Sequence, residues 1–135
     1  MIAFCVKPKK EDKKMQKVTD LYFGKTWFGK RYVGQLEGGY VYTGFGWGRT
    51  CVGSYDGNGC LYSGYGWGRK TVGVFESGIV YSGYGWGKKC IGEYEKGFIY
   101  SGYGMGRTCV GMWDGPDGAA AAAAMLLLIL PAENR

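Results

Sequence analysis

The chain has 135 residues and no histidine, and its five cysteines form no Cys-x-x-Cys pair. Zinc sites are built mostly from these two residue types at close spacing, so a metal site is disfavoured. Without histidine, acid–base catalysis would depend on carboxylates. The carboxylates recur singly at equivalent turns of a repeat, not as one distinctive pair. We therefore predict no catalytic residue, no metal, no cofactor and no enzymatic activity.

Long apolar segments are also scarce. Residues Met1–Val6 lack the charged start and extended apolar run of a secretory signal peptide. The longest apolar run, residues 119–130, is shorter than the roughly 20 residues that a helix needs to span a bilayer. Three cysteines share a repeat position that holds Thr71 in the third unit, as expected of a small strand residue, and free thiols fit a reducing compartment. The sequence therefore predicts a cytoplasmic protein.

Glycine and aromatic residues are abundant instead, with 27 glycines, 12 tyrosines and 5 tryptophans. They are concentrated in a stretch that recurs at spacings of 20, 20, 19 and 19 residues. The five copies, the first of them degenerate, begin at Tyr22, Tyr42, Tyr62, Tyr81 and Tyr100. A short period of glycine and aromatic residues is typical of closed or radial all-β architectures. The chain is therefore predicted to contain five copies of one structural unit.

Each unit is predicted to form two antiparallel strands. In the third unit these are residues 61–67 and 71–76, followed by a tight turn at Ser77-Gly78. Five units then give about ten strands in a meander. A ring of that size is wider than the eight-stranded barrel that side chains alone can fill. We predict an all-β fold in which five β-hairpin repeats close into a ring or barrel.

An apolar C-terminal helix is predicted to occupy the centre of the ring. Residues 119–130 consist of alanine, methionine, leucine and isoleucine, and Pro131 ends the run. A helix that is apolar on every side has to be buried. The predicted organisation is a basic N-terminal arm (1–20), a five-repeat β-hairpin domain (21–118) and the central helix (119–131). The arm is either a solvated segment or a basic tail that reaches an anionic surface.

The alternation of side chains along the first predicted strand of the third unit, residues 61–67, assigns the two faces of the sheet. Gly64 and Gly66 fall on one face, and Tyr65 and Trp67 fall on the other. Glycine at every second strand position indicates that another element approaches closely. We therefore expect these glycines to face the slim, alanine-rich half of the helix and the aromatic side chains to point outwards.

The repeated stretch resembles that of small bacterial proteins called five-fold beta-flower proteins. The resemblance rests on Tyr62-Ser63-Gly64-Tyr65-Gly66-Trp67-Gly68-Arg69, followed by Val-Gly and a glycine turn, and covers about residues 21–118. That family has no established biochemical activity, so the resemblance implies a fold and little more. The Tyr-x-Gly pattern also resembles MORN repeats, which run slightly longer and expect a wider spacing than Trp67-Gly68.

Charged residues at equivalent positions should form rings. The turn after the glycine-rich strand is basic and the opposite turn is acidic, which predicts a basic rim and an acidic rim. A basic rim could bind phosphate or carboxylate groups, or its charges could simply be solvated. The candidate ligand-binding residues of this rim are Arg49, Arg69, Lys88 and Arg107.

A second candidate surface is an aromatic belt, represented by Trp47, Trp67 and Trp86. Exposed aromatic side chains would suit a protein, a sugar or a membrane interface. Alternatively, they pair across strands, or they face inwards because the two faces are reversed. No recognised nucleic-acid-binding module is present, so nucleic acid is a disfavoured partner. A protein or an anionic surface is favoured, and a membrane could be contacted but not spanned.

We therefore predict a non-enzymatic bacterial structural or interaction module whose partner is unknown. The alternative prediction is a peripheral membrane or anionic-ligand binding protein that uses the basic rim.

Overall fold

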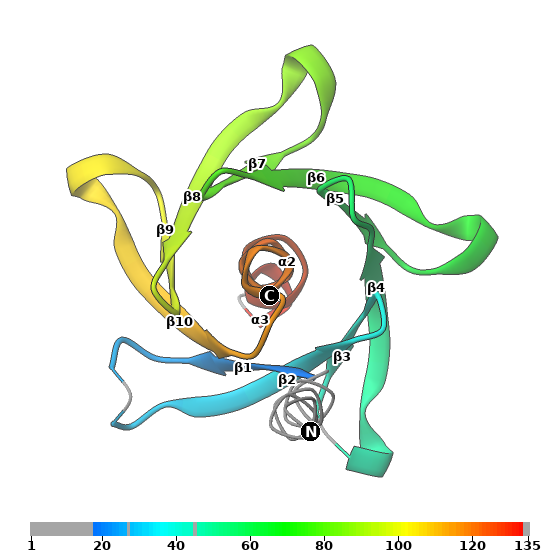
Figure 1. Ribbon diagram of the computed structural model, residues 1–135, viewed down its shortest axis with the longest axis horizontal. Helices are drawn as coiled ribbons and strands as arrows, with labels where there is room; N and C mark the ends of the chain where they lie inside the picture. The colour runs from blue at the N-terminus through cyan, green and yellow to red at the C-terminus, as the bar shows by residue number, and fades with distance from the viewer. Residues whose placement is uncertain (1–17, 27, 45, 134–135) are drawn as a thin grey trace, which may run out of the picture.

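The computed structural model describes residues 18–26, 28–44 and 46–133. Ten antiparallel strands form one closed barrel, in which consecutive strands pair and β1 closes on β10. The strands are β1 (Thr19–Phe23), β2 (Arg31–Glu37), β3 (Tyr40–Thr43), β4 (Thr50–Tyr55), β5 (Cys60–Ser63), β6 (Lys70–Glu76), β7 (Ile79–Ser82), β8 (Lys89–Glu95), β9 (Phe98–Ser101) and β10 (Thr108–Asp114). Five hairpin units surround a central helix in Figure 1. The predicted all-β fold is confirmed.

The units are joined by tight turns at one end of the barrel. At Gly38-Gly39, Ser77-Gly78 and Lys96-Gly97 both turn residues have positive φ. This is the backbone conformation of the two-residue hairpin turn that matches the right-handed twist of the strands. The chain can therefore reverse direction at these points without interrupting the pairing of the strands.

The two strands of each unit pair across a β-bulge. In the third unit Leu61 lies opposite Gly73 and Tyr62 lies opposite Thr71, so Val72 is the extra residue. The carbonyl of Val72 accepts a hydrogen bond of 3.0 Å from the backbone N–H of Gly83 in the next unit. A bulge shifts the phase of side-chain alternation, and here it also connects neighbouring units.

The first strand of each unit is shorter than predicted. β5 ends at Ser63, because Gly64 adopts a φ of +80°, and a short 3-10 helix, η2, follows at Gly66–Gly68. Four such helices occur among the described residues: η1 (Gly46–Gly48), η2 (Gly66–Gly68), η3 (Gly85–Gly87) and η4 (Gly104–Gly106). We call the connecting segments petal loops; their described residues are 24–26 with 28–30, 44 with 46–49, 64–69, 83–88 and 102–107. They project outwards like the points of a star (Figure 1).

The prediction that Gly64 and Gly66 face the central helix is wrong. A Cβ added at Gly66 would meet no atom within 4 Å, and both glycines have the positive φ that other residues adopt only under strain. These glycines serve the turn of the petal loop and not close packing against another element.

The C-terminal helix does lie in the centre of the barrel, as predicted. It comprises α2 (Gly118–Ala124), the π-helical segment η5 (Met125–Ile129) and α3 (Leu130–Glu133). Its alanines belong to the same core cluster as the large apolar residues of the wall. The wall residues with fully buried, large apolar side chains are Leu21, Leu36, Val41, Leu61, Val80, Ile99 and Met112.

The glycines that make room for the helix come from the second strand of each unit. A Cβ added at Gly53 would lie 2.5 Å from Cδ1 of Leu128, closer than real Cβ atoms approach. The five wall glycines and the helix residues that face them are Gly34 and Ile129, Gly53 and Leu128, Gly73 and Leu127, Gly92 and Leu126, and Gly111 and Met125. The glycine ring therefore surrounds the bulky half of the helix, and the expected packing against the alanine half is wrong.

Five consecutive helix residues thus contact five successive units, one residue for each unit. An α-helix turns by about 100° per residue, whereas five equivalent sites on a ring are about 72° apart. Met125–Ile129 forms a π-helical turn, in which the N–H of Leu130 bonds the carbonyl of Met125. Because a π-helix has i→i+5 hydrogen bonds and a wider turn, this segment matches the five-fold wall better than an α-helix would.

The N-terminal end of the helix is fixed to the barrel by Asp117. The Tyr55 hydroxyl donates a 2.6 Å hydrogen bond to the Asp117 carboxylate, and the backbone N–H of Asp117 donates a 2.9 Å bond to the Thr19 hydroxyl. Burial, the Asp117 hydrogen bond and the Asp117 charge all raise the pKa of Tyr55. The described part of the chain begins just before β1, so most of the predicted arm at residues 1–20 lies outside the described residues.

Candidate binding surface

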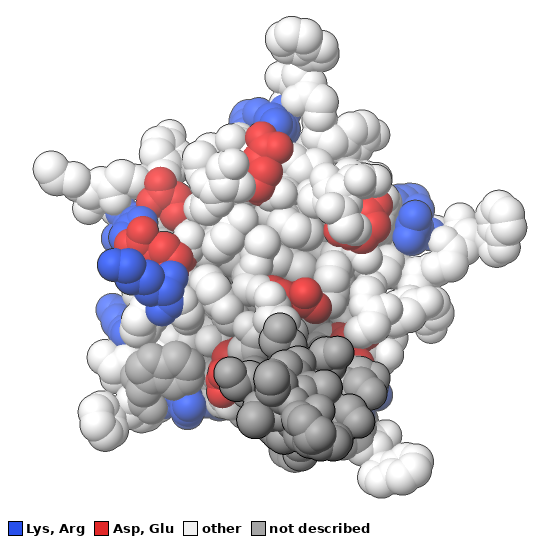
Figure 2. All heavy atoms as spheres, viewed as in Figure 1, with Lys and Arg blue, Asp and Glu red and all other residues white. Residues whose placement is uncertain are grey.

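The petal loops end in fully exposed apolar side chains. The exposed fractions are 105% for Trp47, 106% for Trp67 and 105% for Trp86. Met105 is 100% exposed in the fifth loop, and Phe28 is 92% exposed in the first. Uncharged groups form the outermost points of the molecule in Figure 2. The candidate aromatic residues therefore lie at the loop ends, beyond the sheet, and not along the outer face of the strands.

Glycine isolates each of these indoles. Gly66 and Gly68 flank Trp67, and neither would bring an added Cβ within 4 Å of another atom. No neighbouring side chain in the loop therefore crowds the indole. The fold presents Trp67 to solvent without burying any of its apolar surface.

The candidate residues of the basic rim lie against the outer wall of the barrel. Each places its charged group over the ring of the tyrosine that begins its unit, in a cation–π contact. The distances to the ring centroid are 3.8 Å for Arg49 on Tyr42, 3.8 Å for Arg69 on Tyr62, 4.4 Å for Lys88 on Tyr81 and 3.8 Å for Arg107 on Tyr100.

Three of these four side chains also form ion pairs. The pairs are Arg49 with Glu37 at 3.0 Å, Lys88 with Glu76 at 3.7 Å, and Arg107 with Glu93 at 2.7 Å and Glu95 at 2.9 Å. The basic side chains thus reach along the wall to the acidic residues of the preceding hairpin. Their positive charge is offset locally, so they have a structural role, and their assignment to ligand binding stays a prediction.

In the third unit, the tyrosine that lies under the arginine forms a hydrogen bond with an aspartate. The Tyr62 hydroxyl donates a 2.7 Å bond to Asp56, whose carboxylate also accepts the backbone N–H groups of Asn58 and Cys60. The bond to Asp56, with smaller effects of burial and the Asp56 charge, raises the pKa of Tyr62 to about 12. Partial burial acts to raise the pKa of Asp56. The hydrogen bonds that its carboxylate accepts and the Arg69 charge act in the other direction and together lower the pKa.

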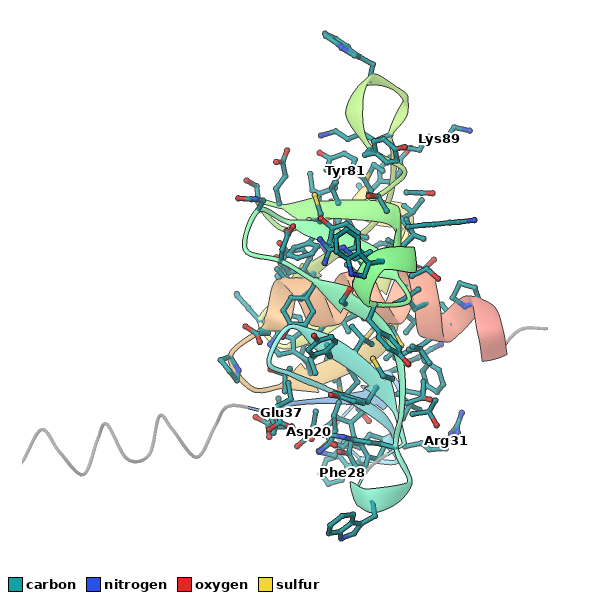
Figure 3. The ribbon with its side chains drawn as sticks, turned by 90° about the vertical axis from the view of Figure 1, so that its right-hand side faces the viewer. Asp20, Phe28, Arg31, Glu37, Tyr81 and Lys89 are labelled. Carbon is teal, nitrogen blue, oxygen red and sulfur yellow. The ribbon has the colours of Figure 1, made fainter. Side chains whose placement is uncertain are left out.

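A separate group of basic residues lies at the start of the second strand of the units. Arg31, Lys70 and Lys89 are all exposed at these positions. Figure 3 shows Arg31 and Lys89 at the end of the barrel from which the central helix emerges, and Asp20 and Glu37 at the opposite end. The predicted separation into basic and acidic ends therefore holds for these side chains.

An open recess lies beside the indole in at least two units. Gln35, Tyr42, Trp47 and Arg49 line a recess of about 550 Å³. The equivalent recess of the next unit, about 470 Å³, is lined by Gly66, Trp67 and Arg69. The recess combines an exposed indole, a guanidinium stacked on a tyrosine and, in the first of these cases, a side-chain amide.

Sequence reasoning missed the tyrosines and Gln35 as parts of this surface. A tyrosine two positions before the first glycine of each petal loop was a usable signal, because it recurs in every unit. Gln35 carried no such signal, since the equivalent residues opposite Tyr62, Tyr81 and Tyr100 are Ser54, Val74 and Glu93.

Among the described residues, no group of three or more His, Cys, Asp or Glu side chains could hold a metal ion. Cys51, Cys60, Cys90 and Cys109 are free. None of the described helices has the length and apolar character needed to cross a membrane. No protein-family model, curated protein or solved structure matches the chain.

Proposed function

We propose that the protein is a non-enzymatic interaction module that binds its partner through the petal loops. The observation that carries this proposal is the complete exposure of Trp47, Trp67 and Trp86 at equivalent positions. Tryptophan is enriched at protein interfaces and among the residues that contribute most to the free energy of binding. Five units with a central helix also support membership of the bacterial five-fold beta-flower proteins, and the four free cysteines support a cytoplasmic location.

The stability of loop variants tests whether these tryptophans serve binding or folding. We expect the triple variant Trp47→Ala, Trp67→Ala, Trp86→Ala to match the wild type within about 0.5 kcal/mol per site, the usual range for surface substitutions. Urea denaturation followed by far-ultraviolet circular dichroism measures this. A loss of several kcal/mol would show that the indoles pack in solution and would overturn the proposal.

The same triple variant is the matched control for partner binding. Material recovered from a lysate of the source organism by the immobilised wild-type protein should be lost with the folded triple variant. Identical recovery by the two proteins would place the binding surface elsewhere.

A second candidate function is peripheral binding to an anionic membrane through the basic end of the barrel. It is favoured by Arg31 and Lys89, which lie at the end of the barrel from which the central helix emerges, and by Lys70, which begins β6 as Lys89 begins β8. Leu130 of the helix is only partly buried. Phosphatidylglycerol vesicles would then sediment the protein at low salt and release it at high salt, because exposed charges are screened. Lys70→Ala and Lys89→Ala should weaken this binding, whereas the triple tryptophan variant should not.

A further inference from the structure

The recesses beside the petal tryptophans offer both hydrogen-bond donors and acceptors. The Arg49 guanidinium donates a 2.9 Å bond to Gln35 and forms a 3.0 Å ion pair with Glu37. A guanidinium is a donor only, a carboxylate is an acceptor only, and an amide is both. A ligand that enters beside Trp47 therefore meets donors and acceptors side by side, next to an apolar indole face.

The net charge of this site is close to neutral. Arg49 is balanced by Glu37, and Lys88 is balanced by Glu76 at 3.7 Å. In the third unit Asp56 lies close enough to Arg69 for the arginine to lower its pKa. A phosphate or sulfate group has acceptors but no donor, and it would be repelled by these carboxylates. The recess is therefore poorly matched to a polyanion.

A carbohydrate has the complementary chemistry. Each hydroxyl group both donates and accepts a hydrogen bond, and a pyranose with equatorial hydroxyls has two flat faces of C–H groups. An aromatic ring carries partial negative charge on its faces, so it attracts the polarised C–H groups of a sugar. Binding sites for small ligands combine such apolar surfaces with a few polar groups, in volumes of about 300–1,000 Å³, a range that includes both recesses.

We infer that the surface beside each described petal tryptophan, recessed at Trp47 and Trp67, binds a neutral β-linked oligosaccharide of equatorial pyranoses, which stacks on the indole and is hydrogen-bonded to the basic residue that lies on the tyrosine of the unit. This inference rests on the proposed function, because it names the ligand class of the same loops. The sugar stacks on Trp47, Trp67 or Trp86, while Arg49, Arg69 or Lys88 donates to its hydroxyl groups.

The number of expected sites follows from the number of described petal tryptophans. Among the described residues, three petal loops carry tryptophan, and the equivalent residue of the fifth loop, Met105, is fully exposed but has no aromatic face. The described units therefore provide three sites, on loops that point in different directions around the barrel (Figure 1). A soluble polymer with repeated sugar units would bind several of them at once, with a gain of about 10²–10⁴ in apparent affinity over one site.

Titration of the ¹⁵N-labelled protein with cellohexaose and chitohexaose tests the inference. We expect saturable shifts of the indole N–H resonances of Trp47, Trp67 and Trp86. Trp113 is an internal control, because its ring packs against Tyr94 at 6.1 Å and against the start of the central helix. Trp67→Ala should remove one responding resonance and leave the other two unchanged, and Met105→Trp should add one.

Two results would overturn the inference. The first is the absence of any shift with both oligosaccharides up to about 10 mM, well above the millimolar Kd that one weak contact gives. The second is an equal shift of Trp113, which would indicate a general effect of the additive. If heparin or phosphatidylglycerol vesicles shift the three indoles and the oligosaccharides do not, the ligand class is wrong, while the petal loops remain the binding surface.

Discussion

Because the five wall glycines pack closely around the central helix, we expect a single added methyl group to lower the stability of the fold. In Gly53→Ala the new Cβ would lie 2.5 Å from Cδ1 of Leu128 and 2.5 Å from the carbonyl oxygen of Tyr62. Real Cβ atoms essentially never lie closer than 3.0 Å to such atoms. The leucine can rotate, but the carbonyl belongs to the paired strand β5 and can move only if the sheet is distorted.

The expected magnitude follows from two opposing effects. Overpacking a filled core lowers the stability by about 1–3 kcal/mol. Alanine in a strand is more stabilising than glycine by roughly 0.5–1 kcal/mol. We expect a net loss of about 1–2 kcal/mol in the free energy of unfolding. For a domain of this size that corresponds to a fall in Tm of roughly 3–10 °C.

Gly87→Ala in the fourth petal loop is the matched control. A Cβ at that position would meet no atom within 4 Å, and its φ is not positive, so stability should change by less than about 0.5 kcal/mol. Combining Gly53→Ala with Leu128→Ala should cost at least about 0.5 kcal/mol less than the sum of the single variants, because it removes one of the two collisions. Equal stability of Gly53→Ala and the wild type in urea denaturation would refute the close packing described for this wall.

Three further perturbations test other parts of the structure. Deletion of residues 119–135 should abolish cooperative thermal unfolding, because the barrel would enclose a void; a truncated protein with native Tm would contradict the central helix. Tyr55→Phe should lower the free energy of unfolding by about 1–2 kcal/mol, because Asp117 loses its partner, and no change in urea denaturation would count against this anchor. The raised folded pKa of Tyr62 means that its contribution to stability is present below pH 10 and is lost between pH 10 and about 12. The stability difference between wild type and Tyr62→Phe should therefore disappear over that range, and a difference that persists at pH 12 would contradict the Asp56 bond.

The repeat period allowed the architecture to be predicted, but not the direction in which the side chains point. Five units, closure and the central helix followed from spacing and from one apolar run. The faces were assigned wrongly because alternation was extended from Leu61 through Trp67, whereas β5 ends at Ser63 and a bulge at Val72 shifts the phase of β6. Glycine is used both for positive φ and for close approach, and the sequence alone did not distinguish Gly66, which serves the first, from Gly73, which serves the second.

The candidate surface could be predicted in part. The tryptophans and the basic residues were identified by their recurrence, yet their relation was not, because it depends on side chains that reach across the sheet. Arg49 lies on Tyr42 and pairs with Glu37, twelve residues away, and no local pattern encodes that contact. The π-helical turn at Met125–Ile129 was also beyond prediction, since helix propensity does not depend on which wall a residue will meet.

The match between one helical turn and one circuit of the barrel limits how this fold can change its size. Solenoid proteins gain or lose repeats readily, because each repeat contacts only its neighbours. Here every unit also needs its own residue of the segment Met125–Ile129. A duplication that produced a sixth unit would create a wider ring in which one wall glycine faces no side chain of the helix. A deletion that left four units would leave one bulky helix residue without a glycine to face. The number of units can therefore change only together with the helix, so sequence divergence among the petal loops is the more accessible route to new binding properties.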